Sequence, residues 1–130
     1  MAKTKGTDMI KRSAPLRKHR LGVRRGRVVD RKYLAWVAEQ PCCVSGCYVL
    51  DGERVTVHHV REFGSPKNDH RTIPLLARYH LATVGGRHSI EVLGKVAFQV
   101  LYDIEITDVI ASLNASYLRD HPERRTDFEV

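Results

Sequence analysis

Four histidines in this 130-residue chain have the type and spacing for metal or hydrolytic chemistry. His58 and His59 are adjacent after a β-branched run, and His80 and His88 follow around a segment expected to be helical. Imidazole suits borderline transition metals, and with an ordinary pKa of about 6.5 it accepts a proton at neutral pH. Adjacent side chains on a strand point to opposite faces, so His58 and His59 share one site only at a bulge or strand end. One of them can then bind a metal while the other faces a phosphate.

Two short strands and a helix are expected to position these histidines. Val55, Thr56, Val57 and Val60 predict a strand over 54–60, which carries the histidine pair. A turn-rich loop over 62–70 leads to a second short strand over 72–76, and Pro74 restricts that strand to an edge or a strand end. A helix is expected over 77–83, until two consecutive glycines interrupt it.

Three further helices should complete the core. Asp30 stands at an N-cap position before apolar residues at helical spacing, and Pro41 stops that pattern. One amphipathic helix is expected from Ile90 to Leu101, and another runs to Tyr117 after an N-cap at Thr107. Residues 119–130 are charged and are expected to fray.

Several short motifs occur in a fixed order between Tyr33 and about Phe98. They are Leu34-Ala35-Trp36-Val37, Gln40-Pro41-Cys42-Cys43, His58-His59-Val60-Arg61, Lys67-Asn68-Asp69-His70-Arg71-Thr72-Ile73-Pro74-Leu75, Tyr79-His80, Gly85-Gly86, His88 and Gly94-Lys95-Val96-Ala97-Phe98. In this order the chain resembles the HNH endonucleases, in particular small phage and prophage nucleases related to the recombination-enhancement, RecA-dependent nuclease family. The resemblance implies an α+β fold with a ββα-metal (HNH, or His-Me finger) core and flanking helices.

The resemblance also implies a role for each candidate site residue. His58 would be the first metal ligand and His59 the general base, with His80 and His88 as the ligands from the helical region. Asp69 matches an acidic position that would orient His59 or support the metal ligands, although an Asx-turn in a loop explains it equally well. The implied cofactor is one divalent metal ion, Mg²⁺ or Mn²⁺ in function, with Zn²⁺ or Ni²⁺ as alternatives in the bound state.

The net charge of +7 is concentrated at the N-terminus. Residues 1–32 hold twelve of the 22 Lys and Arg residues and only two acidic ones, whereas the rest holds ten basic and thirteen acidic residues. We therefore expect a disordered basic arm over 1–28, an HNH domain over 29–118 and a charged tail over 119–130. The expected partner is DNA, alone or with a recombinase filament or phage DNA-processing machinery. The candidate DNA contacts are Arg24, Arg25, Arg27, Arg61, Lys67 and Arg78. For the last three, the alternative interpretation is an ordinary solvated charge on the protein surface.

Cysteine content and hydropathy indicate the compartment. Cys42, Cys43 and Cys47 are odd in number and crowded together, which suits a reducing environment better than a disulfide framework. Leu76 stands where relatives often have a cysteine, so a structural zinc would lack its fourth thiolate. No apolar run reaches the ~20 residues that cross a bilayer. We therefore expect a cytoplasmic protein without a membrane partner, in the bacterial host if the chain is phage-encoded.

Two other functions fit the same residues. One is a non-catalytic DNA-binding module in which the histidines hold a structural zinc. The other is an accessory recombination or packaging protein on a nuclease fold that no longer cuts. A structural zinc site fills all four coordination positions with protein ligands, whereas a hydrolytic site keeps one position open and one histidine unligated. The state of His59 therefore discriminates between catalysis and zinc binding.

Overall fold

A small antiparallel sheet with the strand order β2-β3-β4 organises the α+β fold. The computed structural model describes residues 27–62 and 64–128, so Arg24, Arg25 and most of the expected basic arm lie outside the described residues. The strands are β2 (Val49–Leu50), β3 (Glu53–His59) and β4 (Thr72–Leu76). The two strands expected from the sequence are confirmed. The two-residue strand β2 is not among those expected, although Asp51-Gly52, with both residues at positive φ, is a dipeptide typical of the two-residue hairpin turn that joins β2 to β3.

The pairing of β3 with β4 places the histidine pair at the end of a strand. Val57 pairs with Pro74 and His59 with Thr72. Pro74 has no N–H to donate, and its strand lies at the end of the sheet order, as the sequence predicts. Its carbonyl accepts the backbone N–H of Cys43 at 3.0 Å, so the loop after α3 covers this edge.

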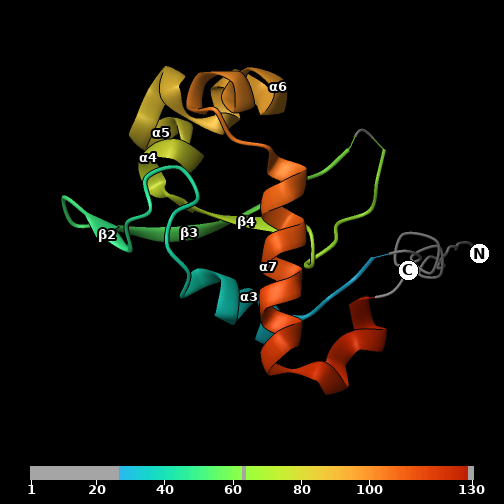
Figure 1. Cartoon of the computed structure of the whole chain (residues 1–130). Coiled ribbons are helices and arrows are strands. Elements are labelled where there is room, and N and C mark those ends of the chain that lie inside the picture. The colour runs from blue at the N-terminus through green and yellow to red at the C-terminus, as the bar shows by residue number, and fades with distance from the viewer. Residues whose placement is uncertain (1–26, 63, 129–130) are drawn as a thin grey trace, which may run out of the picture.

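Helices lie on both sides of the sheet (Figure 1). Helices α4, α5 and α6 gather on one side, α3 lies on the other, and α7 crosses beside β4. None of the described helices is long and apolar enough to span a membrane. The elements are α3 (Arg31–Ala38), α4 (Ala77–His80), α5 (Ala82–Gly85), the 3₁₀ helix η2 (Gly86–His88), α6 (Ile90–Tyr102), α7 (Ile106–Asp120) and the 3₁₀ helix η3 (Pro122–Phe128).

The buried residues form two clusters. The larger cluster joins β4 to α6 and α7 through side chains that include Ile73, Leu75 and Phe98. The smaller cluster is Tyr33, Val37 and Tyr117, and Val57 packs against it from the sheet. Since side chains alternate along a strand, His59 shares the face of Val57, and His58 lies on the opposite face with Thr56.

The helical region after β4 differs from the single helix expected over 77–83. Leu81 has an extended backbone with φ −105° and ψ 128°, which separates α4 from α5. Gly85 then passes so close to α4 that a Cβ atom there would lie 1.7 Å from the Arg78 carbonyl oxygen. Only glycine fits at this contact, so Gly85 packs α5 against the helix that carries His80.

Two expectations about the C-terminal region are wrong. Helix α7 has Glu105 at its N-cap, and Thr107 lies inside the helix. Residues 119–130 do not fray over the described part, because α7 continues to Asp120 and η3 follows it. Phe128 packs against the Tyr33 cluster, so an apolar contact at the end of η3 holds this segment.

Candidate active site

His58 and His59 line a hollow of about 250 Å³ between the end of β3 and the start of α6. His59 is the last residue of β3, which satisfies the condition that adjacent histidines serve one site only at a bulge or strand end. The hollow is lined by His58, His59, Val60, Arg61, Ile90 and Lys95. Two imidazoles and two cationic side chains therefore meet around one space.

His59 is held by Asp69 in a defined orientation. The Nε2 atom of His59 lies 2.9 Å from Asp69 Oδ1. Burial raises the pKa of Asp69, but hydrogen bonds from the Asp30 N–H and from His59 outweigh burial, so the pKa lies below its ordinary value. Because the ionised carboxylate only accepts hydrogen bonds, Nε2 must carry the proton. In the neutral ring the lone pair is therefore on Nδ1, which is the arrangement that a general base uses.

His58 forms a close pair with His80 of α4 on the opposite face of the strand. Their ring centroids are 4.9 Å apart with the planes at 73°. Burial, with smaller contributions from His80 and His59, lowers the pKa of His58 to about 4. Burial likewise lowers the pKa of His80, against the opposing field of Glu91. Both rings are therefore neutral at pH 7, which is the form that binds a metal.

Thr56 fixes which nitrogen of His80 is free. The Thr56 hydroxyl donates to the Leu75 carbonyl oxygen at 2.7 Å, and its oxygen lies 2.7 Å from His80 Nδ1. Since the single hydroxyl proton is already donated, Nδ1 of His80 must donate to Thr56. The lone pair of His80 is therefore on Nε2. No local pattern indicates this role, because a threonine in a β-branched run is explained by its strand propensity alone.

The three-histidine ligand set expected from the sequence is not assembled in the structure. His88 is exposed at the end of η2, and its carbonyl oxygen accepts the Tyr102 hydroxyl at 2.8 Å. Across residues 27–62 and 64–128, no group of three or more His, Cys, Asp or Glu side chains gathers in a metal-binding arrangement. The residues present fit two ligands of a divalent metal, His58 and His80, with the remaining positions left to water and substrate oxygens.

The expected phosphate contacts divide into different groups. Arg61 lines the hollow, and its Nη2 donates to the Ser65 carbonyl oxygen at 2.9 Å. Arg27 and Lys67 are exposed. Arg78 is instead engaged by two carboxylates, with Asp51 Oδ2 at 3.0 Å and Glu53 Oε1 at 3.1 Å. Its charge is already paired, so the structure assigns Arg78 to holding α4 on the β2–β3 hairpin.

Lys95 is the cation that the sequence analysis left without a role. It lies on α6, lines the hollow beside the two histidines and forms an ion pair with Glu62. Glu62 is about half exposed, with a side-chain accessibility of 55%, so this ion pair faces water and exchanges readily. A lysine on a helix that is remote in sequence from the histidine pair has no local pattern that would have identified it.

The cysteines are structural. All three are free thiols; Cys42 is buried in the larger core cluster, and Cys43 and Cys47 pack against it. Burial, with the neighbouring Cys42, raises the pKa of Cys43 to about 12, so this thiol stays protonated. All three thiols therefore contribute to packing of the larger cluster.

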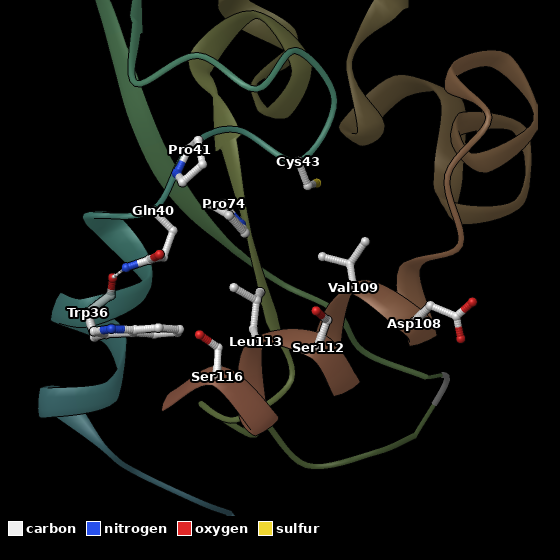
Figure 2. Close-up of a pocket in the computed structure, with 10 residues that line it drawn as sticks. All are labelled: Trp36, Gln40, Pro41, Cys43, Pro74, Asp108, Val109, Ser112, Leu113 and Ser116. Carbon is white, nitrogen blue, oxygen red and sulfur yellow. Dashed lines mark hydrogen bonds between the residues drawn. The ribbon is translucent and has the colours of Figure 1, made fainter. Parts of the chain in front are cut away.

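A larger hollow of about 400 Å³ lies between α3 and α7 and shares no lining residue with the histidine hollow. Figure 2 shows Trp36 with Gln40 and Pro41 on one side of it, and Leu113 with Ser112 on the other. Its lining is mostly apolar, and Asp108 is the one carboxylate among the described residues that form it. These lining residues include no histidine and no cationic side chain, so the smaller hollow is the candidate active site.

Comparisons with protein-family models, with curated proteins and with solved structures found no match to this chain.

Proposed function

We propose that this protein is a metal-dependent endonuclease of the HNH type that hydrolyses DNA phosphodiester bonds. The observation that carries the proposal is the meeting of two histidine arrangements at the end of β3. His59 is bound by Asp69 at 2.9 Å with a lone pair left on Nδ1, and His58 forms a neutral pair with His80. The chain order β3, β4, α4 around them agrees with a ββα-metal core.

The residues divide the chemistry between them. His59 accepts a proton from the attacking water through Nδ1, and Asp69 stabilises the imidazolium that forms. Arg61 and Lys95 line the same hollow, where they bind and orient the phosphate oxygens. His58 and His80 would hold the divalent metal, whose contribution is to stabilise negative charge on the phosphate and on the leaving 3′ oxygen. By the resemblance, the products carry 5′-phosphate and 3′-hydroxyl ends.

The small number of gathered ligands disfavours the non-catalytic zinc-binding module. Beside His59 the structure brings together only the pair His58 and His80, and no group of three or more His, Cys, Asp or Glu side chains gathers within the described residues. A structural zinc site fills every position with protein donors. The arrangement instead keeps a base unligated beside a two-histidine ligand pair.

Metal titration of matched variants tests the ligand assignment. We expect His58→Ala and His80→Ala each to weaken Mn²⁺ binding by about 10-fold or more, because each removes one of two imidazole ligands. His88→Ala should bind Mn²⁺ like the unmodified protein and serves as the control. Calorimetry at constant pH measures the affinities. A loss in His88→Ala equal to that in His58→Ala would contradict the assignment.

The basic N-terminal segment is expected to supply non-specific DNA affinity. Residues 1–26 carry most of the excess positive charge. A deletion should end before Val28, because the Val28 N–H donates to the Lys67 carbonyl oxygen at 3.1 Å and so ties Val28 to the domain. Deleting 1–26 should weaken DNA binding and flatten its dependence on salt concentration, with the thermal unfolding midpoint little changed. Binding isotherms at several salt concentrations measure both. Equal salt slopes for the two proteins would assign DNA binding to Arg61, Lys67 and Lys95.

A further inference from the structure

The side chain of Asp69, which contacts His59, is itself held by the backbone N–H of Asp30, a residue distant in sequence. Asp69 Oδ2 accepts the backbone N–H of Asp30 at 2.8 Å while Oδ1 faces His59. The backbone N–H of Asp69 also donates to the Val28 carbonyl oxygen at 3.0 Å. With both oxygens bound and the side chain buried, the direction of Asp69 depends on where Asp30 lies.

Asp30 is fixed by three partners from different parts of the chain. Its Oδ1 accepts the N–H of Tyr33 as the N-cap of α3, at 3.1 Å. Its Oδ2 lies 2.8 Å from His70 Nε2 and 2.5 Å from Arg124 Nη2. Burial raises the pKa of Asp30, but these hydrogen bonds outweigh it and hold the pKa below its ordinary value. Asp30 is thus ionised, and charge-assisted hydrogen bonds lock it in place.

Arg124 belongs to η3, which is held in position around it. Its Nε donates to Asp127 at 2.7 Å and its Nη1 to the Tyr117 hydroxyl at 2.9 Å. The Phe128 ring stacks on His70 with centroids 3.7 Å apart and planes at 10°. The C-terminal 3₁₀ helix is therefore anchored on the same carboxylate that caps α3.

We infer that Arg124 is a positioning residue for His59, acting through Asp30 and Asp69. The contacts run without a gap from Arg124 Nη2 to Asp30 Oδ2, from the Asp30 N–H to Asp69 Oδ2, and from Asp69 Oδ1 to His59 Nε2. Arg124 touches no group that lines the histidine hollow. Its effect is to hold the carboxylate that fixes the tautomer and ring direction of the base. This inference rests on the proposed function in that His59 is the base.

The test compares Arg124→Met with Arg125→Met. Both remove one positive charge from the same turn, but Arg125 is exposed and Arg124 contacts Asp30. We expect Arg124→Met to lower kcat for DNA cleavage about 10-fold with KM unchanged, Arg125→Met to match the unmodified protein, and Arg124→Lys to recover part of the loss. In the Asp69→Asn background, Arg124→Met should lower kcat little further, because both act through one path. Equal kcat in the two Met variants, or fully additive losses, would overturn the inference.

Nitrogen NMR of histidine-labelled protein gives a readout that does not depend on cleavage. The ring-nitrogen signals of His59 report whether Nε2 carries the proton. We expect Arg124→Met to move these signals toward a mixture of tautomers and Arg125→Met to leave them unchanged. If the unmodified protein does not cut DNA, the proposed function fails, and these signals still decide the positioning role. If Arg124→Met does not fold, Arg124→Lys replaces it, and His59 signals unchanged in that variant would overturn the inference.

Discussion

Replacing His59 by alanine should lower the rate of DNA cleavage by about 10²–10⁴-fold while leaving metal binding nearly intact. The reason lies in the division of the two adjacent histidines between opposite faces of the strand end. His59 contacts Asp69 and is the proposed base, whereas His58 pairs with His80 and is a proposed metal ligand. His58→Ala should therefore weaken metal binding and cleavage together.

The two variants are compared by single-turnover cleavage and by calorimetric Mn²⁺ titration of the same preparations. Thermal unfolding curves provide the control for folding. Loss of metal affinity in His58→Ala alone would support a ligand role for His58 and a base role for His59. Equal loss of metal affinity in both variants would remove the role assignment, since it would make His59 a ligand like His58.

The second large effect is expected from Asp69→Asn, through the tautomer of His59. The Asp30 N–H requires an acceptor at the position of Oδ2, so the asparagine oxygen should take that position and its NH₂ group should face His59. An amide donor at this point forces Nε2 to accept, and the proton of the neutral ring moves to Nδ1. The base then has no lone pair toward the hollow, and cleavage should fall by as much as about 10⁴-fold.

Asp69→Ala is the comparison for this effect. It removes the carboxylate without adding a donor, so the ring of His59 samples both tautomers and a fraction remains competent. We expect Asp69→Ala to keep more activity than Asp69→Asn, measured as kcat on proteins shown to be folded by circular dichroism. An Asp69→Asn variant with a kcat like that of the unmodified protein would show that Asp69 has only the loop-forming role of an Asx-turn.

The sequence predicts the strands and the position of the histidine pair at the end of β3 because these depend on local signals. The β-branched run predicts β3, Pro74 predicts an edge position for β4, and Asp30 predicts the start of α3. The strand-end condition for His58 and His59 also follows from side-chain alternation alone. Each of these expectations depends on residues within one element.

The remaining parts of the site depend on contacts between distant elements, which no local pattern records. Thr56 acquires its role from the tautomer of a histidine 24 positions away, and Arg124 from a carboxylate 94 positions away. The same limit applies to two further residues. Arg78 resembles a free surface cation until the β2–β3 hairpin brings two carboxylates to it. His88, expected as a ligand, is exposed at the end of η2, and no group of three metal-binding side chains gathers in the part of the chain that the structure describes.

Cleavage of supercoiled plasmid DNA by metal-stripped protein tests the central claim most directly. We expect no cleavage after metal removal, nicking on addition of Mg²⁺ or Mn²⁺, and arrest by EDTA, because the two-histidine ligand pair requires a bound cation for charge stabilisation. Zn²⁺ and Ni²⁺ complete the panel, and His59→Ala prepared in parallel controls for contaminating nuclease. The predicted result is that the unmodified protein nicks the plasmid in the presence of Mg²⁺ or Mn²⁺ and that His59→Ala does not. Cleavage that continues undiminished in EDTA, or none with any of the four metals, would contradict the account.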